Sequence, residues 1–195
     1  MIGDDTLTKI LDRFHREWGY AAGMEKILGF IPGAKSFPPY KVQVPEGKVS
    51  IVDTYFGKRE SGGMAVASLN DVPFLLIQYH GGETPKVPDE AVREISDFLK
   101  RAIVCSPLAR LPNMLGPHIF YEEDRYGYAG YAIGNIWDLT WAEIIYSKGG
   151  ERDLRFLYEG PTAEERFIHT MAYGLRDAGQ DLAIFYHVLT HQRIR

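Results

Sequence analysis

The sequence contains only one cysteine among 195 residues, and no apolar run approaches the length of a membrane helix. One cysteine cannot form an intrachain disulfide, and it excludes zinc sites that are built from several cysteines. A membrane-spanning helix needs about 18 or more consecutive apolar residues. The N-terminus, Met-Ile-Gly-Asp-Asp, lacks the basic and then apolar pattern of a signal peptide. These absences predict a cytoplasmic protein that does not enter a membrane.

Positive charge is not in excess either. The chain has 22 Lys and Arg residues against 26 Asp and Glu residues, which gives a net charge of -4 at pH 7. Such a chain does not attract phosphate backbones over long range, so we expect no broad nucleic-acid binding. The 45% hydrophobic and 25% charged residues are typical of a globular protein. We therefore expect a single domain over residues 1–195.

Three segments have apolar residues at helical spacing, three and four positions apart. The second segment opens with Pro88-Asp89-Glu90, and the third opens with the capping-box pattern from Thr162 to Glu165. The apolar positions are Leu7, Ile10, Leu11, Phe14 and Trp18; then Val92, Ile95, Phe98, Leu99, Ala102 and Ile103; then Phe167, Met171, Leu175, Ala178, Leu182, Phe185 and Leu189. The pattern predicts three main helices, the last over residues 162–192. That helix would either cover a sheet or pair with its twin in a homodimer.

Strands are predicted between these helices by alternating or short apolar runs. They cover residues 49–55, 64–68, 74–79, 119–122, 126–133, 139–146 and 154–158, with a hairpin turn at Asn70-Asp71. The predicted fold is therefore α+β, with antiparallel strands. Because helix and strands follow each other in the same order twice, we interpret residues 5–82 and 88–160 as copies of one helix-plus-three/four-strand unit. The alternative is a chance similarity of two antiparallel meanders.

Several short motifs carry a resemblance to a known family. They are Asp53-Thr54-Tyr55-Phe56-Gly57, Tyr79-His80-Gly81, Phe98-Leu99-Lys100-Arg101-Ala102, Leu115-Gly116-Pro117, Glu143-Ile144-Ile145 and Tyr158-Glu159-Gly160. Over most of residues 7–160 the chain resembles a prokaryotic family of unknown function, some members of which are fused to helix-turn-helix domains. The family usually has Arg where Leu115 stands and an acid where Ala65 stands. The resemblance implies an architecture, and it implies no activity.

Three polar residues of the predicted strands are candidates for acid–base chemistry. Asp53 lies in an apolar strand; buried, it would need a partner or a raised pKa, whereas facing solvent it would need neither. His80 precedes Gly81 and fits a general base, a ligand or a turn residue. Glu143 shares a strand face with Trp141, which would raise its pKa if that face is inward and leave it solvated otherwise. An enzyme would need all three acid–base groups at one cavity.

Aromatic residues suggest a second, non-catalytic interpretation. They make up 13% of the chain, and tyrosine combines an apolar body with a polar tip, which suits a small-molecule pocket or an interface. The candidate ligand-binding residues are Tyr55, Tyr79, Tyr128, Trp141 and Tyr158. The first functional hypothesis is thus a domain that binds a small molecule or a protein between its halves. An aromatic core without a ligand explains the same composition.

Metal binding has one weak candidate pair. His187 and His191 are four residues apart and would share one face of the predicted last helix, where two imidazoles can hold a divalent ion. No Glu follows His187 directly, so the zinc-protease pattern is absent. We therefore expect no metal and no cofactor.

Overall fold

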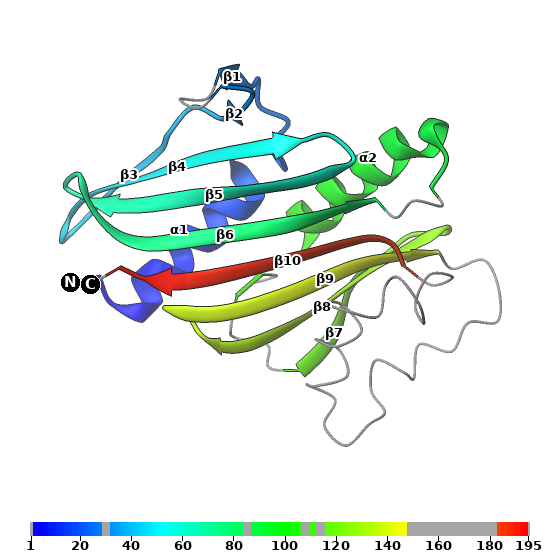
Figure 1. Ribbon diagram of the computed structural model, residues 1–195. Helices are drawn as coiled ribbons and strands as arrows, with labels where there is room; N and C mark the ends of the chain where they lie inside the picture. The colour runs from blue at the N-terminus through cyan, green and yellow to red at the C-terminus, as the bar shows by residue number, and fades with distance from the viewer. Residues whose placement is uncertain are drawn as a thin grey trace.

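The computed structural model describes residues 2–28, 32–83, 87–106, 110–111, 116–147 and 183–194. Most of the described residues belong to one large antiparallel sheet, and two helices accompany it (Figure 1). The elements in chain order are α1 (Asp4–Glu17), β1 (Ile27–Leu28), β2 (Lys35–Ser36), β3 (Tyr40–Val44), β4 (Gly47–Gly57), β5 (Glu60–Leu69), β6 (Val72–Glu83), α2 (Asp89–Cys105), β7 (Gly116–Glu122), β8 (Tyr126–Asn135), β9 (Asp138–Ser147) and β10 (Ala183–Arg193).

The sheet is continuous across all ten described strands. Its order is β1-β2-β4-β5-β6-β10-β9-β8-β7, and β3 pairs with β4 beside β2. Hairpins account for five of the nine pairings, because short turns join β3 to β4, β4 to β5, β5 to β6, β7 to β8 and β8 to β9. Asn70 and Asp71 form the β5–β6 turn with φ values of 50° and 65°, the left-handed geometry that the sequence predicted for this hairpin.

Both helices lie on the same face of the sheet, behind it in Figure 1. The buried side of α1 contains Leu7, Ile10, Leu11 and Phe14 and packs in one core cluster with residues of β3 to β6 and of β8, β9 and β10. A second cluster joins α2 to residues of β8, β9 and β10. Each fully buried large aliphatic side chain contributes roughly 1.5–3 kcal/mol, so the two amphipathic stripes attach the helices firmly. The core under α1 thus extends over strands of both halves of the sheet, and the core under α2 over strands of the second half.

The prediction of three main helices is wrong. The described residues contain two helices, and residues 183–193, which were assigned to the last helix, form β10. Phe185 and Leu189, the two positions of the predicted stripe in this stretch, are four residues apart, an even number that fits strand alternation as well as a helical face. Burial follows the strand period: alternate residues from Phe185 to His191 are buried. The fold is therefore mostly sheet rather than a balanced α+β arrangement.

β10 occupies the middle of the sheet, where it joins the two halves of the chain (red in Figure 1). It pairs antiparallel with β6 on one edge and with β9 on the other. In the described chain order, α1 is followed by six strands, β1–β6, and α2 by four, β7–β10. Common ancestry of the two stretches and a single domain over residues 1–195 stay predictions. The predicted strand at 154–158 lies outside the described residues.

None of the helices in the described part of the chain is long and apolar enough to cross a membrane. The edges of β10 are already bonded within the chain, so its described residues do not form the helix through which a homodimer was expected. Dimerisation itself stays a prediction.

Candidate functional site

Two glycines on the helix-covered face let large aromatic rings lie across neighbouring strands. A Cβ at Gly63 of β5 would come within 2.6 Å of the Tyr79 hydroxyl oxygen, and one at Gly130 of β8 would come within 2.2 Å of the Trp141 ring. Each ring therefore occupies the space where a side chain would stand. This places the polar tips of Tyr79 and Trp141 above the sheet, where they meet two carboxylates.

The first carboxylate, Glu143 on β9, is fully buried and surrounded by donors. Arg110 contacts both of its oxygens, with Nε donating to Oε2 at 2.9 Å. The Tyr128 hydroxyl donates to Oε2 at 2.5 Å, and Trp141 Nε1 donates to the same oxygen at 2.9 Å. Nδ1 of His187, on the adjacent strand, lies 3.1 Å from Oε1 but is not aligned as a hydrogen bond. Glu143 is thus a buried anchor with its acceptor capacity filled.

The charge of this cluster is set by the Arg110–Glu143 pair. Burial acts to raise the pKa of Glu143, but the Arg110 guanidinium and the His187 contact outweigh burial and hold the pKa well below its usual range. Burial also lowers the pKa of His187, so this ring is neutral near pH 7. The cluster therefore contains one positive and one negative charge that balance each other.

The second carboxylate, Asp53 on β4, has a different environment. Its Oδ1 accepts a hydrogen bond from the Tyr79 hydroxyl at 2.6 Å. Burial raises the pKa of Asp53 to about 6, even though the Tyr79 hydrogen bond and the nearby Arg110 charge act in the opposite direction. No arginine or lysine among the described residues forms an ion pair with Asp53. This carboxylate can therefore change protonation near neutral pH, as functional carboxylates often do.

A cavity of about 50 Å³ lies between the two helix C-termini and the sheet. It is lined by Phe14, His15, Trp18, Gly19, Tyr20, Ala21, Asp53, Ile103 and Arg110. His15 is only 8% exposed, and its Nε2 has no hydrogen-bond partner in the described residues. Burial and the charge of Arg110 keep the pKa of His15 well below its usual value, so the ring is neutral. The polar end of the cavity thus combines His15, Asp53 and Arg110.

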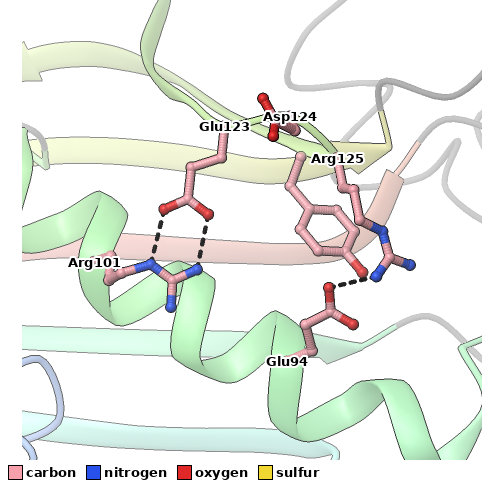
Figure 2. Close-up of a pocket in the computed structure, with 6 residues that line it drawn as sticks. Glu94, Arg101, Glu123, Asp124 and Arg125 are labelled. Carbon is pink, nitrogen blue, oxygen red and sulfur yellow. Dashed lines mark hydrogen bonds and ion pairs between the residues drawn. The ribbon is translucent and has the colours of Figure 1, made fainter.

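A larger cavity of about 400 Å³ lies on the surface between α2 and the β7–β8 turn. Figure 2 shows that four of its charged side chains form two pairs: Arg101 contacts both oxygens of Glu123 at 2.8 Å, and Arg125 contacts Glu94 at 2.7 Å. These exposed ion pairs satisfy each other and are worth little individually. We therefore place the candidate site in the smaller cavity, where a buried polar atom is unpaired.

The predicted acid–base residues are not brought together as one set. Asp53 lines the cavity, whereas Glu143 lies behind Arg110 with all its partners in place. His80 is exposed on the opposite face of the sheet, because it alternates with Tyr79 along β6. Its ring lies 6.2 Å from that of Tyr186.

The predicted aromatic residues have structural partners. Tyr128 and Trp141 are fully buried and donate to Glu143, and Tyr79 donates to Asp53. The ring of Tyr55 stacks on Phe37 with centroids 5.7 Å apart. These residues build the floor of the site, and the cavity itself is lined by others. Tyr158 lies outside the described residues.

His187 and His191 share one face of β10, but they lie farther apart in a strand than they would in a helix, because a strand rises more per residue. Four residues of strand span about 13 Å, too far for two imidazoles to hold one ion. His191 Nδ1 lies 2.9 Å from the carbonyl oxygen of Ile136. Within the described residues, no group of three or more His, Cys, Asp and Glu side chains is arranged to hold a metal.

Sequence reasoning missed the two residues that define the polar end of the cavity. His15 continues the buried stripe of α1, since it follows Leu11 by four positions, and this spacing could have identified it. Arg110 lies in an irregular segment after α2 and has a φ of 66°, which non-glycine residues rarely adopt. No periodic pattern marks such a position.

Comparisons with known protein families, curated proteins and solved structures found no match to this chain. The resemblance to a prokaryotic family of unknown function therefore stays a prediction, and the function has to be argued from the geometry of the site.

Proposed function

We propose that this protein binds a small molecule in the cavity between α1, α2 and the sheet. The observation that carries the proposal is the Nε2 atom of His15, which is buried beside the cavity without a hydrogen-bond partner. Leaving a buried polar atom unpaired costs roughly 1–3 kcal/mol. A ligand or an ordered water that pairs with this atom recovers that free energy.

The lining has the composition of a binding site for a small molecule. Phe14, Trp18 and Tyr20 offer apolar and aromatic surface, while Asp53 and Arg110 offer charged groups at one end. Ligand cavities commonly combine an apolar wall with a few convergent polar groups. A volume of about 50 Å³ is too small for a protein segment. The protein-binding form of the hypothesis therefore has no support from this cavity.

Nuclear magnetic resonance of the histidine rings provides a direct test. We expect small molecules from a fragment library to shift the ring signals of His15, while those of His80, on the exposed opposite face, stay unchanged. Ala21→Leu puts a larger apolar side chain at the cavity and should weaken binding, whereas His80→Gln should not. If no fragment shifts His15, or if the two variants respond alike, the proposal is wrong.

Catalysis is the second candidate function, because Asp53 has a pKa of about 6 beside the cavity. A carboxylate with such a pKa can take a proton near neutral pH. The enzyme would then use Asp53 with His15 and Arg110, rather than with His80, which is exposed on the other face. Glu143 would hold Arg110 in place.

The catalytic hypothesis can be tested without a known substrate. Wild-type protein and Asp53→Asn would each be incubated with a mixture of small metabolites, and consumption would be followed by mass spectrometry. A reaction that wild type catalyses and Asp53→Asn does not supports this hypothesis. A reaction at equal rates with both proteins excludes Asp53 as the base.

A further inference from the structure

We propose that the ligand carries a protonated amine, which binds between the Asp53 carboxylate and His15 Nε2. This inference rests on the proposed function, because it names the chemical class of the molecule that occupies the same cavity. It follows from three properties of the lining: the charge balance, the available acceptors and the aromatic wall.

The charge balance around the cavity favours a cation. Arg110 lines the cavity, but both oxygens of Glu143 bind it, so its charge is compensated. Lys100, which lies over the ring of Tyr20, is paired with Asp97. Asp53 has a neutral hydrogen-bond partner, the Tyr79 hydroxyl, and no ion-pair partner within the described residues. The neighbouring histidine, His15, is neutral. Near pH 7 the surplus charge of the site is therefore negative and located on Asp53.

The available hydrogen-bonding groups fit an ammonium group. A carboxylate accepts hydrogen bonds only, and Asp53 has acceptor capacity beyond the single bond from Tyr79. A neutral imidazole that carries its proton on Nδ1 offers Nε2 as an acceptor. An ammonium group has three donors and no acceptor, so it can use the free acceptors of Asp53 and His15 together.

The wall and the volume of the cavity agree with this assignment. Phe14, Trp18 and Tyr20 place three aromatic side chains around the space, and ring faces attract cations. A volume of about 50 Å³ holds about three to five water-sized groups, since each needs roughly 10–15 Å³. A small primary amine fits this space. A longer molecule could insert its amine end into the cavity, while the rest of the molecule extends to solvent past the half-buried Trp18 and Tyr20.

Three molecules of nearly equal size separate the alternatives. Ethanolamine, ethylene glycol and glycolate would be titrated into the wild-type protein at neutral pH, with the His15 ring signals as the readout. We expect ethanolamine to bind at least about tenfold more tightly than the other two. The reason is that one additional charge-assisted hydrogen bond raises affinity by about this factor. Tighter binding of glycolate would show that Arg110 recognises the ligand. Equal binding of ethylene glycol would show that the site does not recognise charge. Either result overturns this inference and leaves the proposed function intact. If none of the three binds, this inference fails, and the fragment screen separately decides whether the proposed function fails with it.

A pair of variants assigns the effect to one carboxylate. Asp53→Asn keeps the shape of the side chain and removes its charge, so ethanolamine affinity should fall about tenfold or more. Asp71→Asn, in the exposed β5–β6 turn, is the matched control and should bind as wild type does. Unchanged affinity of Asp53→Asn would overturn the assignment, whatever the wild-type titrations show.

Discussion

Two carboxylates on the same face of this sheet differ in pKa because their partners differ. Arg110 lowers the pKa of Glu143 against the effect of burial, whereas Asp53 has only the Tyr79 hydroxyl and a more distant Arg110, so burial dominates. Environment rather than residue type therefore assigns the roles: one carboxylate is fixed as an anion, and the other can be protonated near neutral pH.

Glu143 should be essential for stability. Replacing it in Glu143→Gln leaves the Arg110 guanidinium buried without a counter-charge, which we expect to cost about 3–5 kcal/mol of unfolding free energy in urea denaturation. Glu123→Gln breaks the exposed pair with Arg101 and should cost less than about 1 kcal/mol. Similar losses in the two variants would contradict a special role for the buried pair.

Asp53 should make stability depend on pH in a defined direction. Its pKa is about 6 in the folded protein, above the ordinary value of 3.8, so between these pH values the folded state binds more protons than the unfolded state. The contribution of Asp53 to stability is then most favourable below about pH 4, falls as pH rises to about 6, and stays constant above it. Tyr55, Tyr79 and Arg110 do not titrate across this range, because their pKa values are raised. His15 has a lowered pKa, so its own contribution to stability rises with pH, but wild type and an Asp53 variant share that contribution.

Asp53→Asn removes this pH-dependent contribution, so the difference in stability between wild type and variant measures it. We expect the variant to be more stable than wild type by about 1–3 kcal/mol at neutral pH, with the difference disappearing towards pH 4. Urea unfolding of both proteins between pH 4 and pH 7 measures this difference in unfolding free energy. A difference that is constant over this range would show that the folded pKa of Asp53 is ordinary.

At this scale the sequence could identify candidates but not their chemistry. Alternation placed Glu143 on the same face as Trp141, and the structure makes that face inward. The inward alternative predicted a raised pKa, however, and the pKa is lowered. The cause is Arg110, which is 33 residues away in the sequence and reaches Glu143 only through the tertiary fold.

At the scale of elements, the strand glycines explain how the site is built. Gly63→Ala would put a methyl group 2.5 Å from the Thr54 carbonyl oxygen and 2.6 Å from the Tyr79 hydroxyl, and should cost about 1–3 kcal/mol through overpacking. Gly62→Ala is the adjacent control: its nearest contact would be 3.5 Å, and it should be neutral or stabilise slightly. Urea unfolding measures both, and equal effects would show that Tyr79 does not lie over Gly63.

Elements were predictable where their pattern was unambiguous. The stripes of α1 and α2 fit only a helix, and β4 shows strand alternation at Val49 and Ile51, which are buried on either side of a half-buried Ser50. Residues 183–193 were misassigned because Phe185 and Leu189 are four apart, which fits both periods. The richness of this stretch in aromatic and β-branched residues, such as Phe185, Tyr186 and Val188, was the signal that favoured a strand.

At the scale of the whole molecule, the sequence could not predict which strands meet. Hairpin neighbours follow from short turns, but the pairing of β10 with β6 joins residues more than 100 positions apart. The cavity has the same origin, since its lining comes from α1, the segment that follows it, β4, α2 and Arg110. Local patterns contain no information about these contacts.

β10 lies in the middle of the sheet, so the stability of the whole chain depends on it. Without residues 183–195, β6 and β9 would each lose a partner and expose an unpaired edge, which favours aggregation. We expect the truncated chain to lose cooperative unfolding in urea. Removing only residues 194–195 deletes a single described backbone hydrogen bond, from Ile194 to Phe74, and should leave the transition almost unchanged.

A synthetic peptide of residues 183–195 tests whether this segment forms a strand between β6 and β9. Added to the truncated chain, it should restore cooperative unfolding by inserting between β6 and β9. Leu189→Lys in the peptide puts a charge into the core and should abolish the rescue, whereas Val188→Lys, on the half-buried opposite face, should weaken it far less. Equal failure of the two peptides, or rescue by both, would contradict the strand alternation, because only a period of two separates these adjacent residues onto opposite faces.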